Sequence, residues 1–195
     1  MLAVWLHSLG TEPVLEDVPV PEPAGGEVLV RVAACGVCRT DLHIVEGSQT
    51  RVSPPVTLGH EIAGWVAAYG PAVSADPPLP LETPVVVYGG WGCGTCSDCG
   101  AGAEQRCAFG RSPGFQLDGG WAEYVLVPSV DYLVRLPPGL DPVRAAPLAD
   151  AGVTPYRAVE RARPFLRPGA RVLLIGFGGL GQFALQYLRR LPDLT

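Results

Sequence analysis

Residues 92–107 read Gly-Cys-Gly-Thr-Cys-Ser-Asp-Cys-Gly-Ala-Gly-Ala-Glu-Gln-Arg-Cys and place four cysteines in one short, glycine-rich stretch. Two, two and seven residues separate Cys93, Cys96, Cys99 and Cys107. Thiolate sulfurs bind zinc at about 2.3 Å, and Gly, Ser and Asp spacers let the backbone fold around a tetrahedral ion. Because four thiolates fill every position on zinc, the pattern predicts a structural site that braces a loop and binds no substrate.

Two disulfides are the alternative for the same four cysteines, and they require an oxidising compartment. Residues 1–10 lack a basic segment followed by an apolar run, so they show no secretory signal. No apolar run reaches the roughly 18 residues that span a bilayer. We therefore expect a cytoplasmic protein outside the membrane, and a reducing cytosol favours zinc over disulfides.

The composition indicates a globular protein, since 48% of the 195 residues are hydrophobic and 17% are charged. This length suits one ordinary core and part of a second domain. The net charge is −5 and the arginines form no basic cluster, so nucleic acid is not an expected partner. Lys and Asn are absent, which excludes catalytic-lysine chemistry and N-glycosylation.

Short β-rich runs punctuated by Pro and Gly fill the first part of the chain and predict a barrel-like or sandwich β domain. The predicted strands are residues 3–6, 27–33, 62–69, 85–88, 122–127 and 132–136. Residues 71–84 carry five prolines and should form a surface connection. From Asp141 the pattern becomes helical, and it predicts helices at residues 143–151 and 154–162.

A glycine-rich turn near the end of the sequence joins a predicted strand, residues 171–175, to a predicted helix, residues 182–191. The turn reads Gly176-Phe177-Gly178-Gly179-Leu180-Gly181. Strand, glycine turn and helix follow the order of a dinucleotide-binding fold, in which a helix N-terminus binds the pyrophosphate. We expect the first β-α unit of a truncated Rossmann domain, whose unpaired strand promotes association.

A second group of potential metal ligands is separate from the four cysteines. Cys38 lies in Cys35-Gly36-Val37-Cys38-Arg39-Thr40-Asp41-Leu42-His43, and Gly59-His60-Glu61 follows a proline-rich loop. A thiolate, an imidazole and one further ligand, with the fourth position open, form the arrangement in which zinc acts as a Lewis acid. Each motif alone has a non-functional interpretation: a lone Cys is usually a small buried hydrophobe, and a lone His-Glu pair is more often a surface coincidence. Cys35 is interpreted as buried packing.

These motifs resemble, in their order along the chain, those of the zinc-dependent medium-chain alcohol dehydrogenases, in particular bacterial secondary-alcohol dehydrogenases. The resemblance rests on residues 36–41, 59–61, the four-cysteine loop 93–107, residues 151–156 and the glycine turn, and it covers nearly all of the sequence. It implies a mainly β, GroES-like, partly open barrel as the catalytic domain over residues 1–150. A connecting helical segment, residues 151–170, and the start of a Rossmann coenzyme domain, residues 171–195, follow.

The resemblance implies that Cys38 and His60 are catalytic zinc ligands. Asp150 is expected as the third ligand, because it stands where many members have Cys and because Asp is an acceptable zinc ligand. Its alternative is an ordinary acidic residue near a helix. Glu61 is implied as the nearby carboxylate that orients the site or approaches the metal.

The resemblance also implies roles around the metal. Thr40 and His43 match a relay that passes the alcohol proton through the cofactor ribose to water, with turn capping as the alternative for Thr40. Arg39 matches a position that contacts the coenzyme pyrophosphate, and its alternative is a solvated surface Arg. Thr154 matches a position that lines the nicotinamide site, and its alternative is a helix cap. The coenzyme phosphates would lie on the turn residues Gly176, Gly178, Gly179, Leu180 and Gly181.

The implied reaction is hydride transfer between an alcohol and NAD(P)+, with two zinc ions per chain and with NAD favoured over NADP. The small-molecule partner is an alcohol, aldehyde or ketone, and the full-length protein is expected to be a homodimer or homotetramer. The 195 residues alone should bind zinc without turnover, since most of the coenzyme domain is not among them. The residue that selects NAD or NADP is expected past Thr195. Two alternatives stay open: a non-catalytic zinc-stabilised β module, and a zinc-free quinone-type reductase of the same superfamily, against which the ligand set argues.

Glu82-Thr83 is a local departure from the family's sequence pattern, because the family often has Gly-Asp in this turn.

Overall fold

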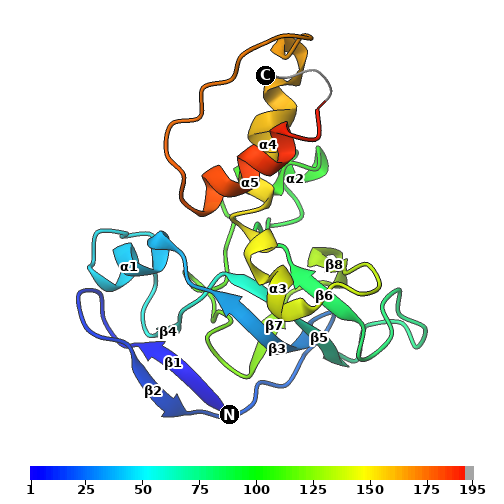
Figure 1. Cartoon of the computed structure of the whole chain (residues 1–195). Helices are drawn as coiled ribbons and strands as arrows, with labels where there is room; N and C mark the ends of the chain where they lie inside the picture. The colour runs from blue at the N-terminus through cyan, green and yellow to red at the C-terminus, as the bar shows by residue number, and fades with distance from the viewer. Residues whose placement is uncertain (192–195) are drawn as a thin grey trace. The chain divides into compact units, whose positions relative to one another are not determined.

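The computed structural model describes residues 1–191, and the chain divides into two compact units, Met1–Ala149 and Asp150–Thr195. The first unit contains two antiparallel sheets, one of three strands in the order β2-β1-β4 and one of five in the order β7-β3-β5-β6-β8 (Figure 1). The strands are β1 Leu2–Leu6, β2 Val14–Asp17, β3 Val28–Gly36, β4 Val56–Thr57, β5 Glu61–Tyr69, β6 Pro84–Val87, β7 Tyr124–Val127 and β8 Leu133–Arg135. The sheets have open edges, which agrees with the predicted GroES-like, incompletely closed architecture.

The central strands β3 and β5 bury apolar side chains at alternate positions. Val28 and Val30 on β3, with Ile62 and Val66 on β5, belong to the largest core cluster. Ala63 points to the opposite face and packs in a second cluster. That second face is covered by the short helix α3 (Pro142–Ala145) and the 3₁₀ turn η3 (Ala146–Ala149). Because successive strand residues point to opposite faces, burial on both sides fixes the register of β5.

A third cluster attaches helix α1 (Arg39–Val45) to the small sheet. Its fully or almost fully buried members include Leu6 from β1, Ile44 from α1 and Val56 from β4. Ile44 is therefore the apolar anchor that holds the helix directly after Cys38 in place.

The second unit contains two packed helices, α4 (Val153–Ala162) and α5 (Gly179–Leu188). The Tyr187 hydroxyl donates a hydrogen bond to the Gly152 carbonyl at 3.1 Å, and its ring meets Tyr156 edge-on at 5.6 Å between centroids. The predicted strand 171–175 is not confirmed, because this segment pairs with no strand among residues 1–191. A parallel strand needs neighbours for its hydrogen bonds, and the side chain of Ile175 is 89% exposed instead.

The six strands predicted in the first part of the chain are all present, with their ends shifted by one or two residues at most sites. The predicted helix 143–151 is α3 followed by η3, 154–162 is α4, and 182–191 is α5 shifted towards its N-terminus. The structure adds β2, β4 and α1, together with the short turns α2 (Ser97–Gly100), η1 (Glu104–Arg106), η2 (Val130–Tyr132) and η4 (Arg163–Phe165).

The turn before β6 is strained at Glu82, whose φ of 60° lies in the left-handed region. The resemblance noted above implies a glycine at this position in many related sequences. The Glu82 carboxylate contacts the Arg31 guanidinium at 2.6 Å, and that guanidinium lies 4.4 Å from the centroid of the Trp65 ring. The side-chain pair thus holds the turn across β3 and β5.

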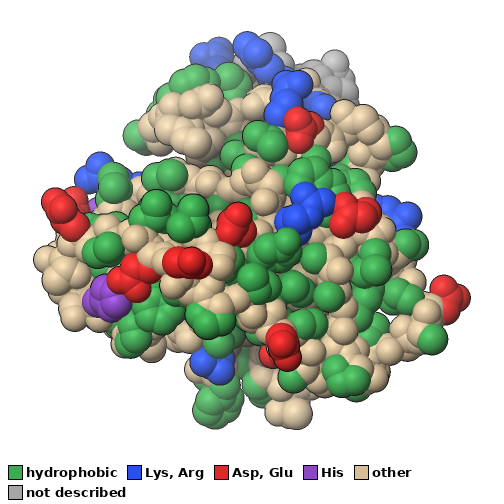
Figure 2. Space-filling model, turned by 90° about the horizontal axis from the view of Figure 1, so that it is seen from below, with side chains coloured by type: hydrophobic (Ala, Val, Ile, Leu, Met, Phe, Trp, Pro, Cys, Tyr) green, Lys and Arg blue, Asp and Glu red, His purple; other side chains and the backbone are tan. Residues whose placement is uncertain are grey.

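The described surface shows no large region of one charge on the face drawn in Figure 2, where acidic side chains are spread among hydrophobic and uncharged atoms. No helix within residues 1–191 combines the length and the apolar character needed to cross a membrane.

Candidate functional site

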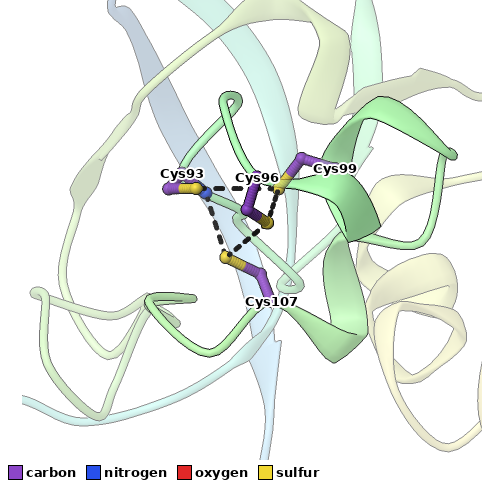
Figure 3. Close-up of side chains that lie close together, drawn as sticks. All are labelled: Cys93, Cys96, Cys99 and Cys107. Atoms are coloured by element: carbon purple, nitrogen blue, oxygen red, sulfur yellow. Dashed lines mark hydrogen bonds between the residues drawn. The ribbon is translucent and has the colours of Figure 1, made fainter.

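The four cysteines of the 93–107 loop point their sulfurs toward one another (Figure 3). Cys96 precedes helix α2, Cys99 lies within it, and Cys107 follows η1. The Sγ–Sγ distances are 3.5 Å from Cys96 to Cys99, 3.7 Å from Cys96 to Cys107 and 4.0 Å from Cys93 to Cys99. Sulfurs that each lie about 2.3 Å from a tetrahedral ion are about 3.8 Å apart, so this donor set fits zinc.

The disulfide alternative is wrong, because all four cysteines are free and their sulfurs lie well beyond the roughly 2.05 Å of an S–S bond. A hydrogen bond with the Thr95 hydroxyl lowers the pKa of Cys93 to about 6. Burial raises the pKa of the neighbouring Cys99 to about 12, so Cys93 is the thiol of this pair that more readily forms the metal-binding thiolate.

An ion pair and a glycine support the conformation of this loop. Arg106 donates to the Asp98 carboxylate at 2.7 Å and ties η1 to α2. A Cβ on Gly92 would lie 2.5 Å from the sulfur of Cys99, so a glycine there allows the thiol to approach the chain.

Cys38, His60 and Glu61 form a second group, whose ligand atoms lie within 4.8 Å of one another. The pairing of β3 with β5 causes this meeting, because Gly36 is the register partner of Glu61. Cys38 follows the end of β3, and His60 directly precedes β5. His60 and Glu61 are buried and Cys38 is half-buried, so the thiol and imidazole point into a partly enclosed site.

Two glycines lie beside this group where a neighbouring side chain approaches the backbone closely. A Cβ on Gly36 would lie 2.0 Å from a carboxylate oxygen of Glu61. Gly59 has a φ of +94°, and its Cβ would lie 2.7 Å from the sulfur of Cys35. Burial raises the pKa of the Cys35 thiol to about 12, so it stays protonated, as its predicted packing role requires.

Asp41 contacts both predicted zinc ligands, although the sequence reasoning gave it no role. Its carboxylate is fully buried; one oxygen accepts the Cys38 backbone N–H at 2.7 Å, and the other lies 3.3 Å from Nδ1 of His60. A carboxylate behind a ligating imidazole fixes the ring and leaves Nε2 for the metal. The signal in the sequence was the acidic residue three positions after Cys38, the spacing of a helix-capping side chain.

The predicted relay residues lie on α1. Oγ1 of Thr40 is 3.6 Å from the sulfur of Cys38, which brings the hydroxyl to the candidate metal ligands. His43 lies three residues later, on the same side of the helix, and its Nδ1 is 3.5 Å from the Glu46 carboxylate. Arg39 is exposed at the first position of α1, as both the pyrophosphate and the surface interpretations require.

Asp150 is the first residue of the second unit, and its part in the zinc site stays a prediction. Its Oδ1 accepts a hydrogen bond from the Thr154 hydroxyl at 3.2 Å. Thr154 therefore acts locally as a partner of Asp150 at the start of α4.

The glycine turn places its residues at the N-terminus of α5, as predicted. Gly178 precedes the helix, which begins at Gly179, and Gly176 has a φ of +91°. A Cβ on Gly181 would lie 2.4 Å from the carbonyl oxygen of Gly176, so glycine is needed for the turn to close. Backbone N–H groups at such a terminus suit a phosphate.

The chain is similar to known proteins over most of its length. Residues 24–138 match the family model "Alcohol dehydrogenase GroES-like domain". A D-arabinose 1-dehydrogenase (NADP(+)) of Saccharolobus solfataricus is 41% identical over 93% of this chain and 52% of the relative. An NAD-dependent alcohol dehydrogenase of Sulfurisphaera tokodaii is 40% identical over 100% of this chain and 57% of the relative.

Solved structures agree with these relatives. The D-arabinose dehydrogenase from Sulfolobus solfataricus superposes with a TM-score of 0.89 at 38% identity, covering 100% of this chain and 58% of that structure. The alcohol dehydrogenase from Aeropyrum pernix gives a TM-score of 0.86 at 39% identity, covering 97% of this chain and 56% of that structure. The chain therefore spans about half the length of the relatives it matches.

Proposed function

Because the chain belongs to the alcohol dehydrogenase GroES-like family, we propose that it forms the zinc-carrying part of an NAD(P)-dependent alcohol dehydrogenase. The observation that supports this most is the presence of two distinct donor groups in one unit. Four thiols form a closed set, whereas Cys38 and His60 form an incomplete one that leaves room for another ligand and for substrate.

When bound at the second group, zinc supplies Lewis acidity that makes the substrate hydroxyl easier to deprotonate. Cys38 and His60 hold the ion, Asp41 orients the imidazole, and Glu61 adds negative charge beside it. Asp150 is the proposed third ligand. With it, the protein would supply two negatively charged ligands to the ion, one thiolate and one carboxylate.

Thr40 accepts the alcohol proton in this proposal, because its hydroxyl lies beside Cys38. The imidazole of His43, on the same helix and partly exposed, would pass this proton on to water. Arg39 and the glycine turn, residues 176–181, bind the coenzyme phosphates, and Thr154 lines the nicotinamide site.

We propose NAD as the coenzyme, because the Sulfurisphaera tokodaii relative is NAD-dependent by name, although the Saccharolobus relative is named for NADP. The substrates are small alcohols and the corresponding aldehydes or ketones. The working protein is a homodimer or homotetramer in the cytoplasm, where free thiols are kept reduced for zinc.

The test is alcohol-dependent reduction of NAD+ by the complete protein that contains this sequence, before and after removal of zinc. Activity should disappear on chelation, return with zinc, and be absent in Cys38→Ser. A protein that binds a single zinc ion, at the four cysteines, and oxidises no alcohol would instead be the non-catalytic β module. Oxidoreductase activity that survives complete removal of zinc would indicate the quinone-type alternative.

A further inference from the structure

A cavity of the first unit lies next to the Cys38–His60 group, to which Phe115 connects it. Its volume is about 280 Å³, close to the lower end of the range for ligand sites. Phe115 lines this cavity, and its ring packs against the His60 ring at 5.4 Å between centroids. Phe115 is therefore a residue that the lining of the cavity and the surroundings of His60 have in common.

The cavity carries an excess of positive charge. Arg51 and Arg111 line it together with a single carboxylate, that of Glu104. Among residues 1–191, neither guanidinium has a carboxylate within 4.0 Å. This local excess opposes the net charge of the chain, which is −5.

Hydrogen bonds through Gln116 hold the two arginine-bearing loops together. Its side-chain amide donates to the Arg51 carbonyl, and its side-chain oxygen accepts the Ser112 N–H at 3.1 Å. Its backbone carbonyl accepts from Nη2 of Arg111 at 3.2 Å. The loops are thus positioned before any ligand arrives, which lowers the entropic cost of binding.

We infer that this cavity binds an anionic group, a carboxylate or a phosphate, of the alcohol substrate, and that Arg51 and Arg111 determine this specificity. Guanidinium groups pair with both kinds of anion through charge-assisted hydrogen bonds. Trp91 and Phe115 supply the apolar surface for the carbon chain between the anion and the hydroxyl. That the anion belongs to the alcohol substrate rests on the proposed function, whereas the binding of an anion in this cavity does not.

The experiment measures binding of glycerate, glycerol 3-phosphate and neutral glycerol to the 195-residue chain by calorimetry, at low and moderate salt. Cys38→Ser serves as the background, so that anions cannot bind a zinc ion held by Cys38. Variants Arg51→Gln and Arg111→Gln are compared with Arg135→Gln, which removes a surface guanidinium that also donates to one backbone carbonyl, at 3.0 Å.

Both anions should bind more tightly than glycerol, and more weakly as salt increases. Arg51→Gln and Arg111→Gln should each weaken anion binding about tenfold, while Arg135→Gln leaves it unchanged. The relative strength of glycerate and glycerol 3-phosphate identifies the anion that the site prefers. Equal affinity for glycerol and the anions, or anion binding that neither cavity variant weakens, would overturn the inference. The zinc content of the unsubstituted chain tests the proposed function separately, because a single bound zinc would refute that function and leave the anion result standing.

Discussion

Replacing Asp41 by Asn should weaken zinc binding at the Cys38–His60 group without affecting the four-cysteine loop. The carboxylate is 0% exposed, so no water replaces the contacts that it makes with the Cys38 N–H at 2.7 Å and with Nδ1 of His60 at 3.3 Å. The loss of an outer-shell carboxylate reduces metal affinity about 10- to 100-fold. This corresponds to about 1.4 to 2.8 kcal/mol.

The assay is competition for zinc with a chromophoric chelator, which resolves a tight and a weaker site in one titration. Asp118→Asn is the control, since Asp118 is an exposed carboxylate that accepts the Thr57 backbone N–H at 2.8 Å and belongs to neither donor group. Thermal unfolding of both variants establishes that they are folded. If Asp41→Asn and Asp118→Asn bind zinc equally well at the weaker site, Asp41 does not orient His60.

Three further changes test the packing of the first unit. Gly64→Ala should destabilise the protein by about 1–3 kcal/mol, because its Cβ would lie 2.0 Å from the Arg31 carbonyl oxygen; Gly26→Ala, whose Cβ meets nothing within 4 Å, should be near neutral in thermal unfolding. Glu82→Gly should raise the melting temperature, because a φ of 60° costs about 1–2 kcal/mol, more than an exposed ion pair contributes; Glu82→Ala keeps the strain, loses the pair and should lower it. Burial raises the pKa of Cys35 from 9.0 to about 12, so the protonated thiol favours folding fully below pH 9, and that contribution is lost as the pH rises toward 12. Unfolding free energies of wild type and Cys35→Ala should accordingly converge only above pH 9, and a constant difference would contradict this.

The sequence predicted those strands whose apolar residues alternate and are buried. Strand β2 was not predicted, because its residues are mostly exposed and show no such alternation. Strand β4 was not predicted either, because two residues are too few to show an alternating pattern. The apolar run 171–175 predicted a strand, but a strand forms only against a partner, and residues 1–191 provide none for it.

In the candidate site, too, the features set by local spacing were predictable from the sequence, and those set by tertiary packing were not. The four-cysteine cage was predictable because its spacing is local. Cys38 and His60 are brought together by the register of β3 and β5, which spacing alone does not give, so family resemblance was needed to connect them. The contact of Asp41 with His60, and the meeting of Arg51 and Arg111 at one cavity, arise from tertiary packing and became apparent only in the structure.

The central claim is that one chain carries two zinc sites of different kinds, and elemental analysis of the purified protein tests it most directly. We predict two zinc ions per chain, of which Cys96→Ser removes one and Cys38→Ser the other. A chain that holds one zinc ion and keeps it in Cys38→Ser would contradict the account.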